Sequence, residues 1–373
     1  MKVLVTSTPG LGHILPMVPL VRELRDRGHE LRWVGGHAGL DEIESLGIPV
    51  RHAGMPEADR QRAFSTRHPE VSSLPATDRQ RFAFPRVFGE IAAAEMINPV
   101  RAAAEEWGPD VVLHDAAELA APLVAASLGI PSVSHGFGEI VPEPGVRAAG
   151  EVLAPRWRAE RLEPDAHAGS YRGLYVDIYP PSLRRSDMDH VPRVQPCRPA
   201  DAAPSTGSAV YVTFGTLFNQ VEDALRTAVL AAADAAGEVV VTLGRGRDPA
   251  MLGAVPDHVR VESFIPQAEV LPGCGAVVCH GGSGTVLAAL AHGLPVVCIP
   301  QGADQFANAA NVERVGAGRT LATDASRATL ADAIEHVLHA PGPRRAAADL
   351  AGEIAAMPDH TAVARGIEAF VSG

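Results

Sequence analysis

Lysine is almost absent from this chain. Lys2 is the only lysine among the 373 residues, so nearly every basic side chain is an arginine. A phosphate-loop lysine or an internal lysine that forms a Schiff base therefore cannot be supplied elsewhere in the sequence. This argues against P-loop kinases and pyridoxal enzymes.

Cysteine and long apolar runs are scarce as well. The four cysteines form no Cys-x-x-Cys pair, and three lie in apolar, strand-like segments, so we expect buried free thiols, no disulfide and no zinc. No uninterrupted apolar stretch of about 18 residues occurs. The N-terminus runs from a short apolar segment into a glycine turn, without the pattern of a signal peptide. We expect a cytoplasmic protein without stable membrane insertion.

Positive charge is also in deficit. The net charge is -12, whereas a protein that binds a nucleic-acid polymer needs a basic face to release counterions. We therefore expect no such partner. Hydrophobic residues make up 46% of the chain and charged residues 20%, which is enough for substantial cores. The length fits two domains of about 150 to 200 residues each, in a monomer or homodimer.

Short β-branched runs alternate with longer alanine- and leucine-rich stretches, a pattern typical of βαβ units around a parallel sheet. We predict two Rossmann-like doubly wound α/β domains. The predicted strands are Lys2–Ser7, Glu30–Gly35, Val50–Ala53, Asp110–His114, Pro131–His135, Ala209–Phe214, Glu238–Leu243, Val259–Phe264, Ala276–His280 and Pro295–Pro300. Helices are predicted at Ile14–Arg27 and Ala116–Leu128, among others.

A segment rich in proline and small polar residues separates the two alternating halves. It predicts an N-terminal domain at 1–195, a linker at 196–207 and a C-terminal domain at 208–358. Residues 359–373 have helical spacing and could pack back on the first domain. Met55–Arg81 lacks clear periodicity, and we interpret it as a mobile loop.

The strongest motif is a predicted strand that ends in His280 and continues as Gly-Gly-Ser-Gly-Thr into a helix. Such a turn points backbone amides toward an anion, aided by the helix dipole. A diphosphate could bind there, with His280 donating to a phosphate oxygen. Ser283 and Thr285 could cap the helix or bond phosphate directly. A tight turn with a helix cap is the alternative.

The flanking residues favour a nucleotide sugar. Phe264 precedes Gln267 by three residues at a strand end and could stack on a base, while Asp304 and Gln305 could bond adjacent sugar hydroxyls. The segment resembles the donor-binding signature of inverting GT-B glycosyltransferases, the superfamily of plant and bacterial natural-product enzymes. The resemblance covers most of the second domain and implies two domains that face a cleft.

That resemblance implies a role for each residue of the motif. Phe264 would stack on the base, Asp304 and Gln305 would hold the sugar, and Ile265 and Gln267 are further donor-binding candidates beside Phe264. The diphosphate would be met by a cradle of residues on two turns: Thr216, His280, Gly282, Ser283, Gly284 and Thr285.

The sequence departs from the family pattern at one position. Many UDP-sugar members carry a glutamate eight residues after the signature histidine, where it bonds the ribose hydroxyls, and this chain has Ala288 there. A 2′-deoxyribose needs that carboxylate less. We therefore expect a dTDP-sugar as co-substrate, with a UDP-sugar as the alternative, and no further cofactor.

The first strand leads into Gly10-Leu11-Gly12-His13, at the edge of the sheet where open α/β folds bind ligands. Leu15 stands where a dinucleotide fingerprint needs glycine, which disfavours a nicotinamide oxidoreductase. The run instead resembles the acceptor-side loop of the same glycosyltransferases, whose histidine is the general base. A neutral imidazole suits that task. Asp115, at a matching strand end, could orient His13, and a helix N-cap is its alternative role.

The expected activity is hexosyl or deoxyhexosyl transfer to a small natural-product acceptor, by direct displacement with inversion, as in antibiotic biosynthesis. The Met55–Arg81 loop and the segments around Phe137 and Trp157 would shape the acceptor pocket. Asp187-Met188-Asp189 has the form of a metal-binding DxD motif, but we interpret it as a surface turn and expect metal-independent transfer. Alternatives on the same fold are a nucleotide-sugar epimerase, a glycan-lipid transferase and a non-catalytic auxiliary protein.

Overall fold

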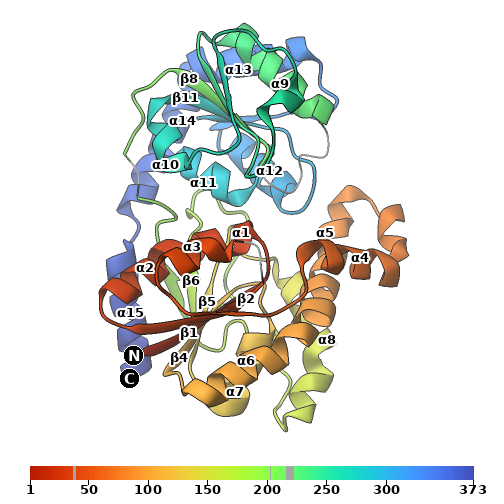
Figure 1. Ribbon diagram of the computed structural model, residues 1–373, viewed down its shortest axis with the longest axis vertical. Coiled ribbons are helices and arrows are strands. Elements are labelled where there is room, and N and C mark those ends of the chain that lie inside the picture. Colours follow the sequence, from red (N-terminus) through yellow and green to blue (C-terminus); the bar gives the residue numbers. More distant parts are fainter. Residues whose placement is uncertain (37–38, 202, 216–221) are drawn as a thin grey trace. The chain divides into compact units, whose positions relative to one another are not determined.

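The computed structural model describes residues 1–36, 39–201, 203–215 and 222–373, and these form two compact units. The first unit comprises Met1–Tyr179, Ser186–Cys197 and Pro358–Gly373. The second comprises Pro180–Arg185 and Arg198–Met357. The chain therefore passes from one unit to the other four times. Each unit is built around its own parallel sheet (Figure 1).

The described part of the first unit has a seven-stranded parallel sheet, in the order β3-β2-β1-β4-β5-β6-β7. The strands are β1 (Lys2–Ser7), β2 (Glu30–Gly35), β3 (Val50–His52), β4 (Val111–Asp115), β5 (Ser132–His135), β6 (Leu174–Asp177) and β7 (Val194–Pro196). The central strands β1 and β4 are buried almost throughout, as expected for a sheet that is covered on both faces. Val3 pairs with Val111 and Thr6 with His114, so both strands end at the same edge.

Helices surround this sheet. They are α1 (Leu11–Ile14), η1 (Leu15–Met17), α2 (Val18–Asp26), α3 (Leu40–Ser45), α4 (Glu57–Arg67), η2 (Pro69–Ser73), α5 (Ala76–Phe84), η3 (Pro85–Ala92), α6 (Ala93–Trp107), α7 (Ala120–Leu128), α8 (Glu143–Ala159) and α15 (His360–Ser372). The C-terminal helix α15 contacts α2, β6 and β7 (Figure 1). Glu368 on α15 accepts hydrogen bonds of 2.8 Å from Arg27 and 2.8 Å from His29.

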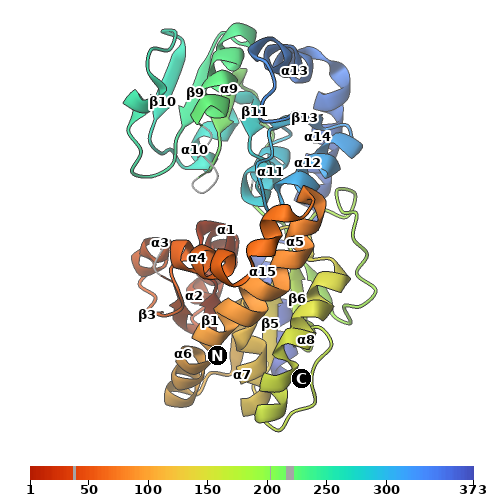
Figure 2. The same cartoon turned by 90° about the vertical axis from the view of Figure 1, so that its right-hand side faces the viewer.

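The interpretation of Met55–Arg81 as a mobile loop is wrong. The segment folds into α4, η2 and the start of α5 (Figure 2). Both α4 and α5 contact η3. Only Arg60 and Phe64 are buried on α4, so the helix covers its neighbours with a narrow face that includes an arginine. The apolar spacing that predicts an amphipathic helix is therefore missing from its sequence.

The predicted helix Ala116–Leu128 begins four residues later than expected. Its first residue is Ala120, and its N-cap is Leu119, not Asp115. The carboxylate of Glu118 accepts hydrogen bonds from the amides of Ala120 and Ala121, both at 3.0 Å. Glu118 therefore satisfies the first free amides of this helix, which leaves Asp115 for other contacts.

The described part of the second unit contains a six-stranded parallel sheet in the order β10-β9-β8-β11-β12-β13. Its strands are β8 (Ala209–Thr213), β9 (Val239–Thr242), β10 (Val259–Glu262), β11 (Cys274–Cys279), β12 (Val296–Cys298) and β13 (Gly318–Thr320). Its helices are α9 (Glu222–Ala235), η4 (Pro249–Leu252), α10 (Gln267–Val270), η5 (Leu271–Gly273), α11 (Ser283–Ala291), α12 (Gln305–Arg314), α13 (Arg327–His339) and α14 (Pro341–Ala356). All four cysteines of the chain are buried free thiols.

Two segments near the unit boundaries are anchored to the second unit. Ser205, in the predicted linker, donates from its amide to His292 O at 2.9 Å and from its hydroxyl to Cys274 O at 2.6 Å. Arg314 on α12 donates to the carbonyls of Ser182 and Leu183, at 3.0 and 2.9 Å. Among the described residues, no helix combines the length and the apolar character needed to cross a membrane.

Candidate active site

His13 and Asp115 meet at the shared edge of β1 and β4. Nδ1 of His13, on α1, lies 3.0 Å from Oδ1 of Asp115, the last residue of β4. Asp115 is fully buried, and its carboxylate also accepts from the amide of Thr8 at 2.7 Å, from the Thr8 hydroxyl at 3.1 Å and from the amide of Ala117 at 2.8 Å. Four donors thus surround one buried carboxylate.

These contacts set the charge of Asp115. Burial alone would raise the pKa of its carboxyl, but the interaction with His13 and the amide hydrogen bonds from Thr8 and Ala117 outweigh it, and the pKa is lowered. The carboxylate is therefore ionised near neutral pH and can only accept. Consequently Nδ1 of His13 carries the proton, and the lone pair of the ring is on Nε2.

Aromatic side chains flank the His13 ring. Phe137 lies 4.6 Å away and Phe88 5.6 Å away, measured between ring centroids. The His13 side chain retains 16% of its exposure. Trp157, in contrast, is fully buried in the core on α8, so its own side chain offers no surface to an acceptor.

A buried arginine lies next to this group. Arg60 on α4 is 5% exposed, and its guanidinium lies 5.5 Å from the ring centroid of Phe88. It donates to Pro9 O at 3.3 Å, and burial lowers its pKa against the opposing charges of Glu57 and Asp115. Arg60 brings positive charge to the same region as the His13–Asp115 pair, and no motif of the sequence predicted it.

Glu118 is a second buried carboxyl near Asp115. Its Oε2 accepts from the hydroxyl of Thr6 at 2.9 Å, in addition to the two helix amides. Burial raises the pKa of Glu118 to about 7, with a contribution from the charge of Asp115. Its position three residues after Asp115 was visible in the sequence, but its burial was not.

In the second unit, β11 leads through His280 and two glycines into α11. Gly281 adopts a φ of +86°, and a Cβ there would lie 2.9 Å from Gln305 O, so a side chain is excluded on both grounds. A Cβ on Gly282 would come within 2.5 Å of Nε2 of His280. Burial lowers the pKa of His280, opposed by the charge of Asp304 and by the backbone of Thr213. The ring is neutral near pH 7.

The hydroxyls of this turn have partners within the protein. Gly282 is the N-cap of α11, without a side-chain cap. Ser283 Oγ instead donates to Asp304 Oδ2 at 2.7 Å, and Thr285 Oγ1 accepts from Gln267 Nε2 at 2.9 Å. The expectation that the Ser283 hydroxyl caps the helix is therefore wrong. Gly284 is exposed at the first turn of α11.

Asp304 and Gln305 lie at the start of α12 with different surroundings. Oε1 of Gln305 accepts from the amides of Gln301 and Gly302 at 2.8 and 3.1 Å, and the side chain is 2% exposed. Asp304 is half-buried, and Ala303 before it adopts a left-handed φ of +52°. Strain of this kind is commonly kept where a functional residue needs a particular orientation.

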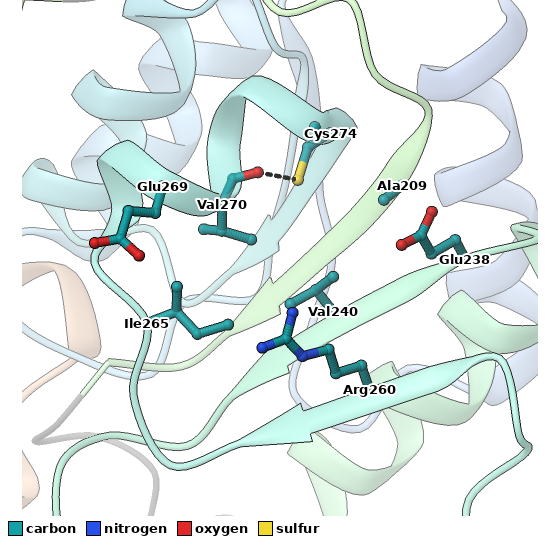
Figure 3. Close-up of a pocket in the computed structure, with 9 residues that line it drawn as sticks. Ala209, Glu238, Val240, Arg260, Ile265, Glu269, Val270 and Cys274 are labelled. Atoms are coloured by element: carbon teal, nitrogen blue, oxygen red, sulfur yellow. Dashed lines mark hydrogen bonds between the residues drawn. The ribbon is translucent and has the colours of Figure 1, made fainter.

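The side chains of Phe264 and Ile265 have different surroundings. Phe264 is 45% exposed and carries the guanidinium of Arg245 at 4.3 Å from its ring centroid. Ile265 lines a pocket of about 270 Å³ together with Val240, Arg260 and Glu269. Figure 3 shows these side chains. Phe264 therefore has free ring surface for a ligand, whereas the partly buried side chain of Ile265 faces this pocket.

The structure thus brings the candidate residues together in two groups. His13 and Asp115 form one group in the first unit. His280, Ser283, Thr285, Gln267, Asp304 and Gln305 are linked by contacts in the second. Thr216 lies outside the described residues.

Sequence reasoning missed two further residues of the second group. Arg245 follows β9 at the strand end, a position typical of ligand contacts in open α/β folds. Asn308 follows Asp304 by four residues on α12, a spacing that places two side chains on one helix face. In the described part of the chain, no three His, Cys, Asp or Glu side chains form a group suited to hold a metal ion.

Comparison with known proteins decides the family. The model for the erythromycin biosynthesis protein CIII-like N-terminal domain matches residues 23–198, and the model for the C-terminal domain of the same family matches residues 226–370. This chain belongs to the erythromycin biosynthesis protein CIII-like family. It is a glycosyltransferase with the GT-B fold, of the class that glycosylates natural products.

Relatives of this glycosyltransferase match along its whole length. The elloramycin glycosyltransferase ElmGT of Streptomyces olivaceus is 35% identical over 372 residues, covering 96% of this chain and 94% of the relative. The L-demethylnoviosyl transferase of Streptomyces niveus is 33% identical, covering 99% and 98%. The spinosyn rhamnosyltransferase SpnG, 27% identical, aligns with a TM-score of 0.80 over 99% of this chain and 100% of its own. SpnG has also been solved with thymidine diphosphate and with the spinosyn aglycone.

Proposed function

We propose that this glycosyltransferase moves a deoxysugar from a dTDP-sugar to a hydroxyl group of a small natural-product acceptor, with inversion at the anomeric carbon. His13 is the general base and Asp115 orients it. The observation that carries the proposal is the 3.0 Å contact between His13 Nδ1 and the buried Asp115 carboxylate. In this proposal, residues 1–195 bind the acceptor, 196–207 form the linker and 208–358 bind the nucleotide sugar.

The base chemistry follows from the protonation of the pair. Because Asp115 only accepts, Nε2 of His13 is free to take the proton of the acceptor hydroxyl as its oxygen attacks the anomeric carbon. The imidazolium that forms is stabilised by the ionised carboxylate 3.0 Å away. The aromatic rings of Phe88 and Phe137 give an acceptor an apolar surface beside the base.

The donor half of the proposal uses the second unit. The amides at the start of α11, together with His280, would hold the diphosphate and stabilise it as it leaves with the electron pair of the broken bond. Phe264 would stack on the base, and Asp304 would accept from sugar hydroxyls. Gln305 would donate from its side-chain NH2 group, since its Oε1 already accepts from two backbone amides. Thr216, Gly282, Gly284 and Thr285 would complete the phosphate contacts, and Ser283 would contribute its backbone amide, because its hydroxyl donates to Asp304.

The choice of dTDP rests on Ala288 and receives support from relatives. The side chain of Ala288 on α11 offers no acceptor for a ribose hydroxyl, so a ribonucleotide gains no hydrogen bond from this position. The complex of SpnG with thymidine diphosphate supports thymine as the base and deoxyribose as the pentose of the nucleotide. The expected cytoplasmic location and the monomer or homodimer remain part of this proposal.

The test compares His13→Ala with the wild type, using a dTDP-sugar and a phenolic or macrocyclic acceptor panel. We expect His13→Ala to bind dTDP normally and to lose at least about 100-fold in turnover. His52→Ala, which replaces a half-exposed histidine on β3, is the matched control. Near-normal turnover of His13→Ala would overturn the base assignment. The anomeric configuration of the product, read by NMR, tests inversion, and donor turnover without acceptor would favour an epimerase.

A further inference from the structure

Asn308 lies behind the candidate sugar site and has no role in the chemistry described above. It is 1% exposed on α12, and its side-chain nitrogen is taken up by three acceptors of the protein itself. Its Nδ2 lies 3.0 Å from Gly281 O, 2.9 Å from Ser283 Oγ and 3.0 Å from Asp304 Oδ2. One side-chain amide therefore contacts the glycine turn, the first residue of α11 and the candidate sugar-binding carboxylate.

The chemistry of these groups fixes the direction of each hydrogen bond. An amide nitrogen only donates, and its two protons serve three acceptors here, so one N–H is shared between two of them. The Ser283 oxygen therefore accepts from Asn308, and its own proton must point elsewhere. That proton goes to Asp304 Oδ2, 2.7 Å from Ser283 Oγ. Asn308, Ser283 and Asp304 thus form a closed triangle in which both donors converge on one oxygen of the carboxylate.

The triangle holds Asp304 through a single oxygen. Both hydrogen bonds reach Oδ2, and none of the described residues donates to Oδ1. The carboxylate is therefore restrained in rotation while one oxygen keeps its acceptor capacity. A group that must bind a hydroxyl in one orientation gains affinity from restraint of this kind, because less freedom is lost on binding.

We propose that Asn308 is a positioning residue for the donor sugar: it holds Asp304, directly and through Ser283, so that Oδ1 is oriented toward a sugar hydroxyl. The bond to Gly281 O anchors the Asn308 amide to the turn. This inference rests on the proposed role of Asp304 in sugar binding. It assigns to Asn308 an effect on the sugar half of the donor, with little effect on the nucleoside diphosphate.

Asn308→Ala, Asp304→Ala and the double variant in the full-length protein test this assignment. The readouts are kcat/KM for a dTDP-sugar and the affinity for dTDP alone by calorimetry. We expect Asn308→Ala to lower kcat/KM at least about 10-fold, the range of coupling between contacting residues, and to change dTDP affinity less than about 3-fold. In the Asp304→Ala background, Asn308→Ala should have less than about 3-fold further effect.

Two further variants separate positioning from folding. Asn311→Ala removes another buried asparagine of α12 and controls for weakening of the helix, so it should keep kcat/KM near the wild-type value. Asn308→Asp keeps the volume but replaces the donor with an acceptor, and it carries the test if Asn308→Ala fails to fold. We expect Asn308→Asp to lose kcat/KM as strongly.

The outcomes distinguish the positioning role of Asn308 from the proposed sugar contact of Asp304. If the effects of Asn308→Ala and Asp304→Ala multiply, or if dTDP affinity falls as much as kcat/KM, the positioning role of Asn308 is overturned while the role of Asp304 stands. If Asp304→Ala itself leaves kcat/KM unchanged, the proposed sugar contact is wrong, and the role of Asn308 falls with it.

Discussion

The hydroxyl of Thr6 donates a 2.9 Å hydrogen bond to Oε2 of Glu118, and both side chains are buried. The contact joins the interior of β1 to the residues that precede α7. It places a carboxyl whose pKa is about 7 close to the Asp115 carboxylate. Two acidic groups that are three residues apart therefore have opposite shifts in pKa, because only Asp115 has a cationic partner when His13 is protonated.

Glu118 should make the stability of the protein depend on pH. Its carboxyl has an ordinary pKa of 4.5, so below pH 4.5 it is neutral whether the chain is folded or unfolded. Between pH 4.5 and about 7 the unfolded chain ionises first, so the folded state loses stability as the pH rises, by about 3 kcal/mol in total. Glu118→Gln should remove this loss. Urea unfolding at pH 5 and pH 8 checks it, and parallel pH dependence of the two proteins would contradict it.

Asp115→Asn should lower turnover less than His13→Ala, because it disturbs the tautomer and the charge without removing the imidazole. It should also lower the melting temperature. An amide in this site directs an N–H group at donors, and a buried polar group without a partner costs about 1 to 3 kcal/mol. Asp110→Asn, just before β4, is the control, because Asp110 accepts from the amide of Lys2 at an exposed position. Unchanged turnover of a folded Asp115→Asn would show that Asp115 is only structural.

Activity should survive excess EDTA. The leaving diphosphate would be met by the amides of α11 and by His280, and Asp187 and Asp189 are exposed side chains of a surface segment. Turnover is measured before and after chelation, with magnesium or manganese added back. Loss on chelation and recovery with either ion would mean that a metal supports the leaving group.

The donor base should be thymine on a deoxyribose. An extra ribose hydroxyl that is buried near Ala288 without an acceptor would cost UDP about 1 to 3 kcal/mol. The methyl group of thymine would gain up to about 0.8 kcal/mol from apolar contact near Phe264. Calorimetric titration of dTDP, dUDP and UDP separates the two effects, because dUDP lacks only the methyl. Tighter binding of UDP than of dTDP would refute the choice of donor and leave the glycosyltransferase assignment intact.

The two sheets could be predicted from sequence where strands were long and apolar. Lys2–Ser7 and Glu30–Gly35 have the predicted bounds because β-branched or apolar residues form most of their buried interior. The strands β6, β7 and β13 were missed: they have only three or four residues, and β7 contains Pro196 while Arg319 is the middle residue of β13. Strands this short give no periodic signal, and β7 and β13 are also edge strands with polar residues, so only pairing in the folded sheet defines them.

The candidate site also has a part that the sequence predicts and a part that it does not. His13 and Asp115 could be paired in advance because parallel neighbouring strands end at one edge of a sheet, so residues just beyond two strand ends must lie close together. The contacts of Asn308, Arg60 and Arg245 depend on the direction of single side chains after the helices have packed. No spacing in the sequence specifies that direction. The buried face of α4 contains an arginine, so the helix itself lacked the apolar pattern by which it could have been predicted.

The four passages of the chain between its units constrain how the enzyme could be recombined. A fragment beginning at residue 198 would omit Pro180–Arg185, which Arg314 holds to the second unit. It would also carry α15 without α2, exposing its apolar face of Val363, Ala364 and Ile367 to water. In the proposed function the second unit binds the donor, so an exchange of sugar specificity between relatives would need a discontinuous graft. Residues 180–185 would come with the second unit, and α15 would stay with the first.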